Sequence, residues 1–152
     1  MDLARTQRLI DRAIKETAAG QFDEAGGTLA QLGKGSDAWQ MYAVCTAFAA
    51  AGAYALKYIH GEAIAPAAGR MLVIQEPYEG AAAADPPGAW AMRFLTAHTN
   101  GDKDMTHALY FAALDASGEE FVASVSRLLR LAGDLTARAT AHEKAQKQRP
   151  PA

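Results

Sequence analysis

The chain has 152 residues, a formal net charge of −2 and a pI near 6.1, so it has no general attraction to nucleic acid or to anionic lipid. Half of its residues are apolar and 21% are charged, which excludes a disordered chain and is typical of one globular domain. Its single cysteine, Cys45, excludes an internal disulfide, and the first residues lack the layout of a signal peptide. We therefore expect a cytoplasmic protein.

The first two predicted helices form a hairpin. One helix should run from about residue 2 to residue 19, where a glycine ends it, and a shorter amphipathic helix follows. The pattern Gly-x-Phe-Asp-Glu-Ala at 20–25, followed by Leu29 and Leu32, resembles the turn of a tetratricopeptide hairpin. The resemblance covers this hairpin alone, because Trp39 does not fall at the register of that family, and it implies the shape of a helical hairpin.

The third predicted helix forms the centre of the domain. Ser36 or Asp37 can cap its start, and Gly61 should end it. Residues 38–56 carry no charge and are as long as a membrane span, but alanine and polar side chains dilute their hydropathy, which favours a buried helix over a membrane helix. Four alanines at every fourth position should form a ridge buried against a neighbouring helix: Ala43, Ala47, Ala51 and Ala55.

The middle of the chain gives weaker patterns. A short helix is expected to start at Pro66, and residues 77–88 should form a mobile connection that can act as a hinge or lid. A fifth helix is predicted from about residue 87 to residue 99, where an asparagine and a glycine should end it. Asp102 or Asp104 then starts the sixth helix.

The last helix is the longest predicted element. Ser117 and Glu120 form the pattern of a capping box at its start. Because the chain becomes polar near its end, we predict a single helical domain over residues 1–141 and a disordered tail over residues 142–152. Together, the patterns predict an all-α bundle of about five to seven helices. The apolar seam of the last helix alternates spacings of four and three: Phe121, Val125, Leu128, Ala132, Leu135 and Ala139.

A short pattern occurs twice. Ala-Trp-x-Met is found at 38–41 and again at 89–92, in each case at the start of a predicted helix. Two helical units of similar design would give this echo, and stacked helical units build interaction surfaces. Coincidence in an alanine-rich chain explains it equally well, so both interpretations stay open.

The densest polar cluster lies between His98 and His107. Asn100, Asp102 and Asp104 match the first oxygens of a calcium loop, but a methionine occupies the position at which that loop requires glycine. A zinc site would need both histidines and a third ligand. The same residue types end one helix and begin the next, and this interpretation is favoured. No metal site and no cofactor are therefore predicted.

Two further features have a structural and a functional interpretation. Cys45 lies within an apolar helix, where a free cysteine packs in the core and is not a reactive thiol. The basic side chains of the last helix suit a solvated helix end better than a contact with phosphate, because no aromatic residue lies between them. No catalytic sequence motif is present.

The preferred functional interpretation is a non-catalytic helical protein that binds a protein partner or a second copy of itself. Val122, Leu129 and Leu131 lie off the apolar seam of the last helix, so a homodimer through the last two helices is expected. The first alternative is a ligand-binding protein or an enzyme with a pocket between helices, and the second is a nucleic-acid-binding regulator. Five side chains would converge in such a pocket: Trp39, Tyr78, Trp90, His98 and His107.

Overall fold

The computed structural model describes residues 1–61, 72–73 and 75–151 and confirms the all-α prediction. Within these residues the chain forms helices and no strand. The expected short helix at Pro66 lies outside the described residues. The seven helices of the described residues are α1 (Leu3–Ala18), α2 (Phe22–Gly35), α3 (Ala38–His60), α4 (Ala81–Ala84), α5 (Pro86–Thr99), α6 (Lys103–Asp115) and α7 (Gly118–Lys147).

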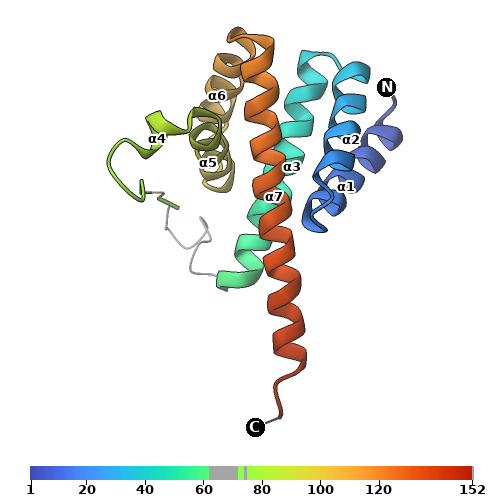
Figure 1. Ribbon diagram of the computed structural model, residues 1–152, viewed down its shortest axis with the longest axis vertical. Coiled ribbons are helices and arrows are strands. Elements are labelled where there is room, and N and C mark those ends of the chain that lie inside the picture. Colours follow the sequence, from blue (N-terminus) through green and yellow to red (C-terminus); the bar gives the residue numbers. More distant parts are fainter. Residues whose placement is uncertain (62–71, 74, 152) are drawn as a thin grey trace.

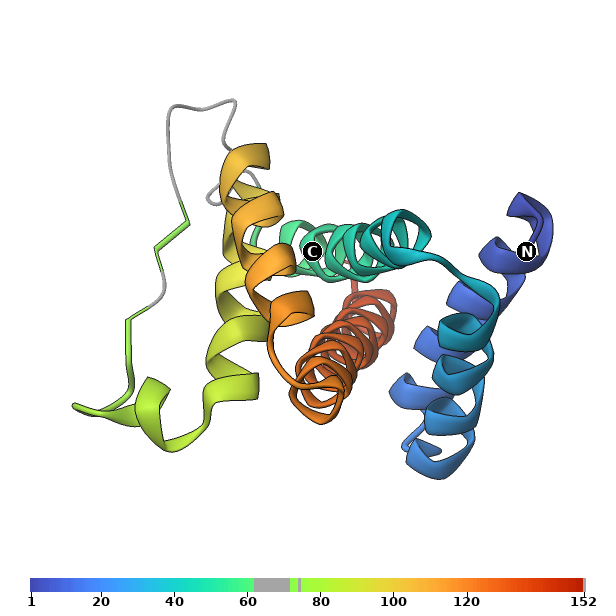
Figure 2. The same cartoon turned by 90° about the horizontal axis from the view of Figure 1, so that it is seen from above.

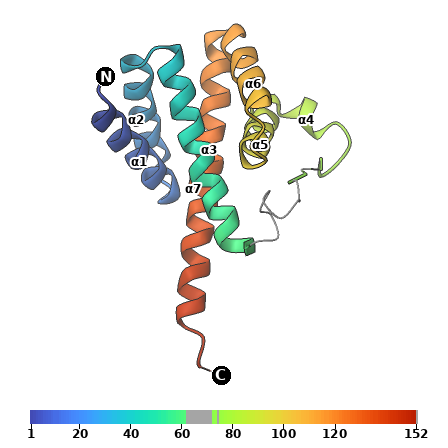
Figure 3. The same ribbon diagram turned by 180° about the vertical axis from the view of Figure 1, so that it is seen from behind.

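Two long helices, α3 and α7, form the centre of the molecule. The hairpin of α1 and α2 packs on one side of this pair, and the hairpin of α5 and α6 packs on the other (Figures 1 and 2). Helix α7 contacts α1, α3, α5 and α6, so it joins both hairpins to one core. Its last turns extend beyond the other helices toward the C-terminus (Figure 3).

Side-chain caps and glycines set the helix ends. Asp37 accepts a hydrogen bond from the Gln40 amide at 2.8 Å, and the Gln40 side chain accepts one from the Asp37 amide at 2.8 Å. Asp102 caps α6 as predicted, and Ser117 caps α7 by accepting from the Glu120 amide at 3.1 Å. Of the capping box predicted at Ser117, the structure gives this serine bond and not the return bond from the Glu120 side chain. Gly20 has a φ of +76° where α1 turns into α2, a conformation that favours glycine.

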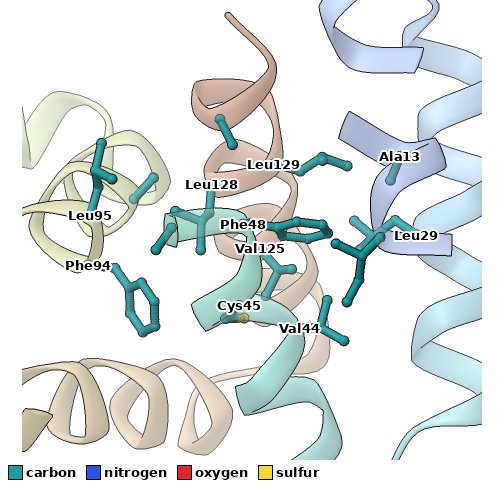
Figure 4. Packing of buried hydrophobic residues seen from close by; sticks show 14 of the residues in the cluster. Ala13, Leu29, Val44, Cys45, Phe48, Phe94, Leu95, Val125, Leu128 and Leu129 are labelled. Atoms are coloured by element: carbon teal, nitrogen blue, oxygen red, sulfur yellow. The ribbon is translucent and has the colours of Figure 1, made fainter. Parts of the chain in front are cut away.

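The hydrophobic core lies between the central pair and the two hairpins. Phe48 of α3 is in the middle of this core, surrounded by side chains from both hairpins and from α7 (Figure 4). Cys45 is also fully buried, which confirms that it packs in the core, and burial raises the pKa of its thiol to about 12. The thiol is therefore protonated at neutral pH.

The predicted alanine ridge on α3 is largely wrong. Ala43 is exposed, Ala47 and Ala51 are half-buried, and only Ala55 is buried. Positions four apart in an α-helix are rotated by about 40°, so the ridge turns through roughly 120° and cannot face one neighbour. Helix α5 instead approaches α3 closely at Gly52, where an added Cβ would lie 3.2 Å from the Leu95 side chain of α5.

The end of the last helix also differs from the prediction. A tail without helix was expected from residue 142, but α7 continues to Lys147. Alanine, lysine, glutamine and glutamate dominate this stretch, and they are all good helix formers, so a polar composition does not end the helix. Helix α4 lies within the connection expected over residues 77–88.

The two Ala-Trp-x-Met segments have different surroundings. Trp39 is 64% exposed at the start of α3, whereas Trp90 is 9% exposed in α5. This difference favours coincidence over a repeated helical unit. No described helix, α3 included, combines the length and the apolar character that a membrane crossing requires.

Candidate functional site

The five side chains expected in one pocket do not converge. Trp39 and His107 both contact Phe111 edge to face, with ring centroids 5.5 Å and 6.4 Å away, and they belong to an aromatic cluster between α3 and α6. Tyr42 lies in the same cluster, 4.8 Å from the His107 ring, and its hydroxyl is 2.9 Å from that of Thr106. These contacts hold α6 against the start of α3, so the cluster has a structural role.

The polar residues between His98 and His107 act as helix caps and anchors. His98 is half-buried near the end of α5, and burial lowers its pKa, so the neutral form of its ring is favoured. Asn100 accepts from the Leu72 amide at 2.7 Å and donates to the Leu72 carbonyl at 3.0 Å. Within the described part of the chain, no three metal-ligating side chains are grouped, and Asp102 is engaged as the N-cap of α6.

The structure places Leu129, which is predicted to lie at a dimer contact, in the core of the chain. Leu129 is 3% exposed and belongs to the core, while Leu131 is half-buried against it. Helices α1, α3 and α5 cover α7 on several sides, so these leucines need no second chain. Val122, the third apolar residue off the seam, is 58% exposed near the start of α7.

Trp90 and Tyr78 instead line two adjoining hollows beside α5. The larger hollow, of about 730 Å³, lies between α5, α6, the start of α7 and the segment 75–85, which we call the strap. The smaller one, of about 440 Å³, lies between the strap and α5 and contains Tyr78. Both are lined by Glu76 and Arg93, so they form one depression, the α5 cleft.

Small and apolar side chains form the floor of the α5 cleft. Trp90 is buried there, stacked on Phe94 at 5.1 Å, and its indole N–H donates to the Leu109 carbonyl at 2.8 Å. Ser124 of α7 is also buried in the lining. Where the described lining consists of alanine, a peptide backbone can approach closely. The small lining residues are Ala82, Ala83, Ala89, Ala112, Ala113 and Ala116.

The strap is fixed at the end that joins α5. Asp85 caps α5 through the Gly88 amide at 3.3 Å and accepts two hydrogen bonds from Arg127 of α7, at 3.0 Å and 2.7 Å. The hydrogen bond from Arg127 is the main reason that the pKa of Asp85 is lowered. Any Cβ at position 88 would clash with the carboxylate of Asp85 and lie 2.8 Å from the Arg127 guanidinium, so glycine permits this ion pair.

Acidic side chains line the α5 cleft, and others adjoin its lining residues along the chain. Glu76 and Glu120 line it, and both are exposed. Three more exposed acids are direct chain neighbours of lining residues: Glu79, Asp115 and Glu119. Among the lining residues that the structure describes, Arg93 is the only cation of the larger hollow. The rim of the cleft therefore favours a cationic partner.

A third hollow, of about 550 Å³, lies between α1, α3 and α7. Its lining includes Ala51 and Ala55 of the supposed ridge, together with Tyr54 and Tyr58. Its lining carries two acids and one lysine, the same balance of charges as the larger hollow of the α5 cleft. The exposed chain neighbours of its lining, however, include the cations Arg12, Lys57 and Lys144, so its surroundings are of mixed charge and select no charge class of ligand. The α5 cleft is the better candidate because both its shape and its charge define a partner.

The acidic rim was missed at the level of sequence. Residues 76–120 contain eight acids and two cations, so a charge count along the chain would have revealed this segment. The count does not reveal the cleft, because the rim combines the strap, the end of α6 and the first turn of α7.

Comparison with known proteins does not assign a function to the α5 cleft. No protein-family model, curated protein or solved structure matches the chain. The chemistry of the α5 cleft is therefore argued from its own residues.

Proposed function

We propose that this chain is a non-catalytic helical interaction protein that binds a basic helical segment of a protein partner in the α5 cleft. The observation that carries the proposal is the combination of a floor of small side chains with an acidic rim. A helix with an alanine or leucine face and flanking lysines matches both features, because its apolar face meets the floor and its cations meet the rim.

The shape of the cleft supports a polypeptide partner. The two hollows share lining residues of the strap and of α5, so together they form one open depression and not a closed cavity. Trp90 in the floor and Tyr78 beside the strap offer the aromatic contact area that is common at protein interfaces. A nucleic-acid partner is disfavoured at this site, because its phosphates would face Glu76 and Glu120.

The test uses Trp90 as the reporter of binding. Trp39→Phe removes the exposed indole and leaves Trp90 as the only tryptophan. Titration with a synthetic helical peptide of alanine, leucine and lysine should change the Trp90 emission in a saturable way at ~0.05 M salt. The apparent affinity should fall at least about tenfold at ~0.5 M salt, because screening weakens contacts between exposed charges. A twin peptide with glutamate in place of lysine should not bind.

Paired variants make the test specific to the cleft. Glu119→Lys with Glu120→Lys reverses two rim charges and should abolish binding of the lysine peptide. The matched control is Asp23→Lys with Glu24→Lys, which makes the same change in the exposed first turn of α2 and should leave binding unchanged. Equal binding of both peptides, or unchanged binding by the rim variant, would overturn the proposal.

A further inference from the structure

The last turns of α7 carry the charge that the α5 cleft lacks. Residues 136–149 contain four cations and one acid, Glu143. Two of the cations, Lys144 and Lys147, lie in the last turn of α7, and the last turns of this helix extend past the other helices (Figures 1 and 3). Alanines recur at every fourth position of the stretch, at 137, 141 and 145. The four cations, all exposed, are Arg138, Lys144, Lys147 and Arg149.

This stretch also matches the floor of the cleft in shape. Ala141 and Ala145 are exposed, and because they are four residues apart they lie on the same face of the helix, where a surface can approach the backbone. The His142 ring contacts the Tyr58 ring of α3 edge to face, with the centroids 5.9 Å apart. A helical segment with so few packing partners gains stability when a surface covers it.

The two complementary surfaces cannot meet within one chain. Glu119 and Glu120 lie in the first turn of α7, whereas Lys144 and Lys147 lie in its last turn. The helix has 30 residues and is therefore about 45 Å long, so it holds its basic end far from its own cleft. Contact between the two ends requires a second molecule.

We infer that the basic segment bound in the α5 cleft is the C-terminal segment 136–149, which includes the last turns of α7, of a second copy of this chain. The inference rests on the proposed function of the cleft and identifies its partner. Two antiparallel copies place each basic end beside the acidic cleft of the other, and this reciprocal arrangement closes a symmetric dimer. The contact differs from the dimer expected at Leu129, because it uses the two ends of α7 and not its middle.

A charge exchange between the two ends tests the inference on the full-length chain. The rim variant is Glu119→Lys with Glu120→Lys, and the tail variant is Lys144→Glu with Lys147→Glu. Sedimentation equilibrium at ~0.05 M salt should give the wild type a weight-average mass well above the 16.1 kDa of one chain, and near that value at ~0.5 M salt. Each variant alone should be monomeric. An equimolar mixture of the two should associate again, because each reversed surface then meets its complement.

Controls and outcomes separate the inference from the proposed function. Arg5→Glu with Arg8→Glu reverses two exposed charges of α1 and should leave association unchanged, and circular dichroism should show the same helix content for all variants. A monomeric wild type, or variants that associate like the wild type, would overturn the inference. If the wild type is monomeric and still binds the lysine peptide, the proposed function stands and its partner is another protein. If it does neither, both fail.

Discussion

Gly133 is the residue that sets the distance between α1 and α7. A Cβ at this position would lie 2.6 Å from the Thr17 Cβ and 3.1 Å from the Ala18 amide nitrogen, and neither atom is the end of a flexible side chain. Gly133→Ala should therefore lower the free energy of unfolding by ~1–3 kcal/mol, although alanine by itself favours the helix by about 1 kcal/mol. Urea denaturation measures this change.

Gly27 of α2 provides the matched control for Gly133, because a Cβ there has no neighbour within 4 Å. Gly27→Ala should stabilise the protein by up to about 1 kcal/mol through helix propensity alone. Stabilisation by both substitutions would show that α1 moves away from α7 without cost, against the packing described here.

At the scale of elements, the strap depends on one exposed ion pair. Asp85→Asn keeps an N-cap side chain for α5 but removes the charged bond to Arg127. Because exposed ion pairs contribute ~1 kcal/mol or less, the melting temperature should change little, while amides of α4 exchange with solvent faster. Hydrogen exchange measures the protection of the α4 amides. The control is Glu143→Gln, which removes an exposed ion pair of α7 far from the strap. Unchanged exchange in Asp85→Asn would contradict the anchoring role.

The same ion pair predicts the pH dependence of the strap. The pKa of Asp85 is lowered in the folded state, so the carboxylate contributes stability above its unfolded pKa of about 3.9, and this contribution is lost as the pH falls through the folded value. Exchange of the α4 amides relative to the core should therefore rise under acid in the wild type. In Asp85→Asn the exchange of the α4 amides relative to the core should not rise under acid.

Local signals in the sequence predicted most helix ends, because caps and glycines act within a few residues. Asp37 and Gly61 bound α3 in this way. The ridge on α3 could not be placed from spacing alone, since its direction depends on which neighbours surround the helix. Trp90 and Tyr78 were assigned to a pocket, but the strap that brings them beside one cleft depends on Arg127, which is 42 residues away from Asp85.

At the scale of the whole molecule, α7 separates the charges. Its first turn borders the acidic cleft, and its last turns are basic, although the net charge of the chain is only −2. The net charge therefore does not reveal this separation of acidic and basic side chains, which depends on how the helices are assembled. This polarity, together with the α5 cleft, is the basis for recognition of a basic helix.

The most direct measurement is a map of amide chemical shifts for the isotope-labelled tail variant, Lys144→Glu with Lys147→Glu, titrated with the unlabelled lysine peptide. This variant should be monomeric, so its shifts report the peptide alone. Shift changes should concentrate in the strap, in α5 around Trp90 and in the first turn of α7 around Glu120. Changes confined to the hollow between α1, α3 and α7, or no saturable change at all, would contradict the account.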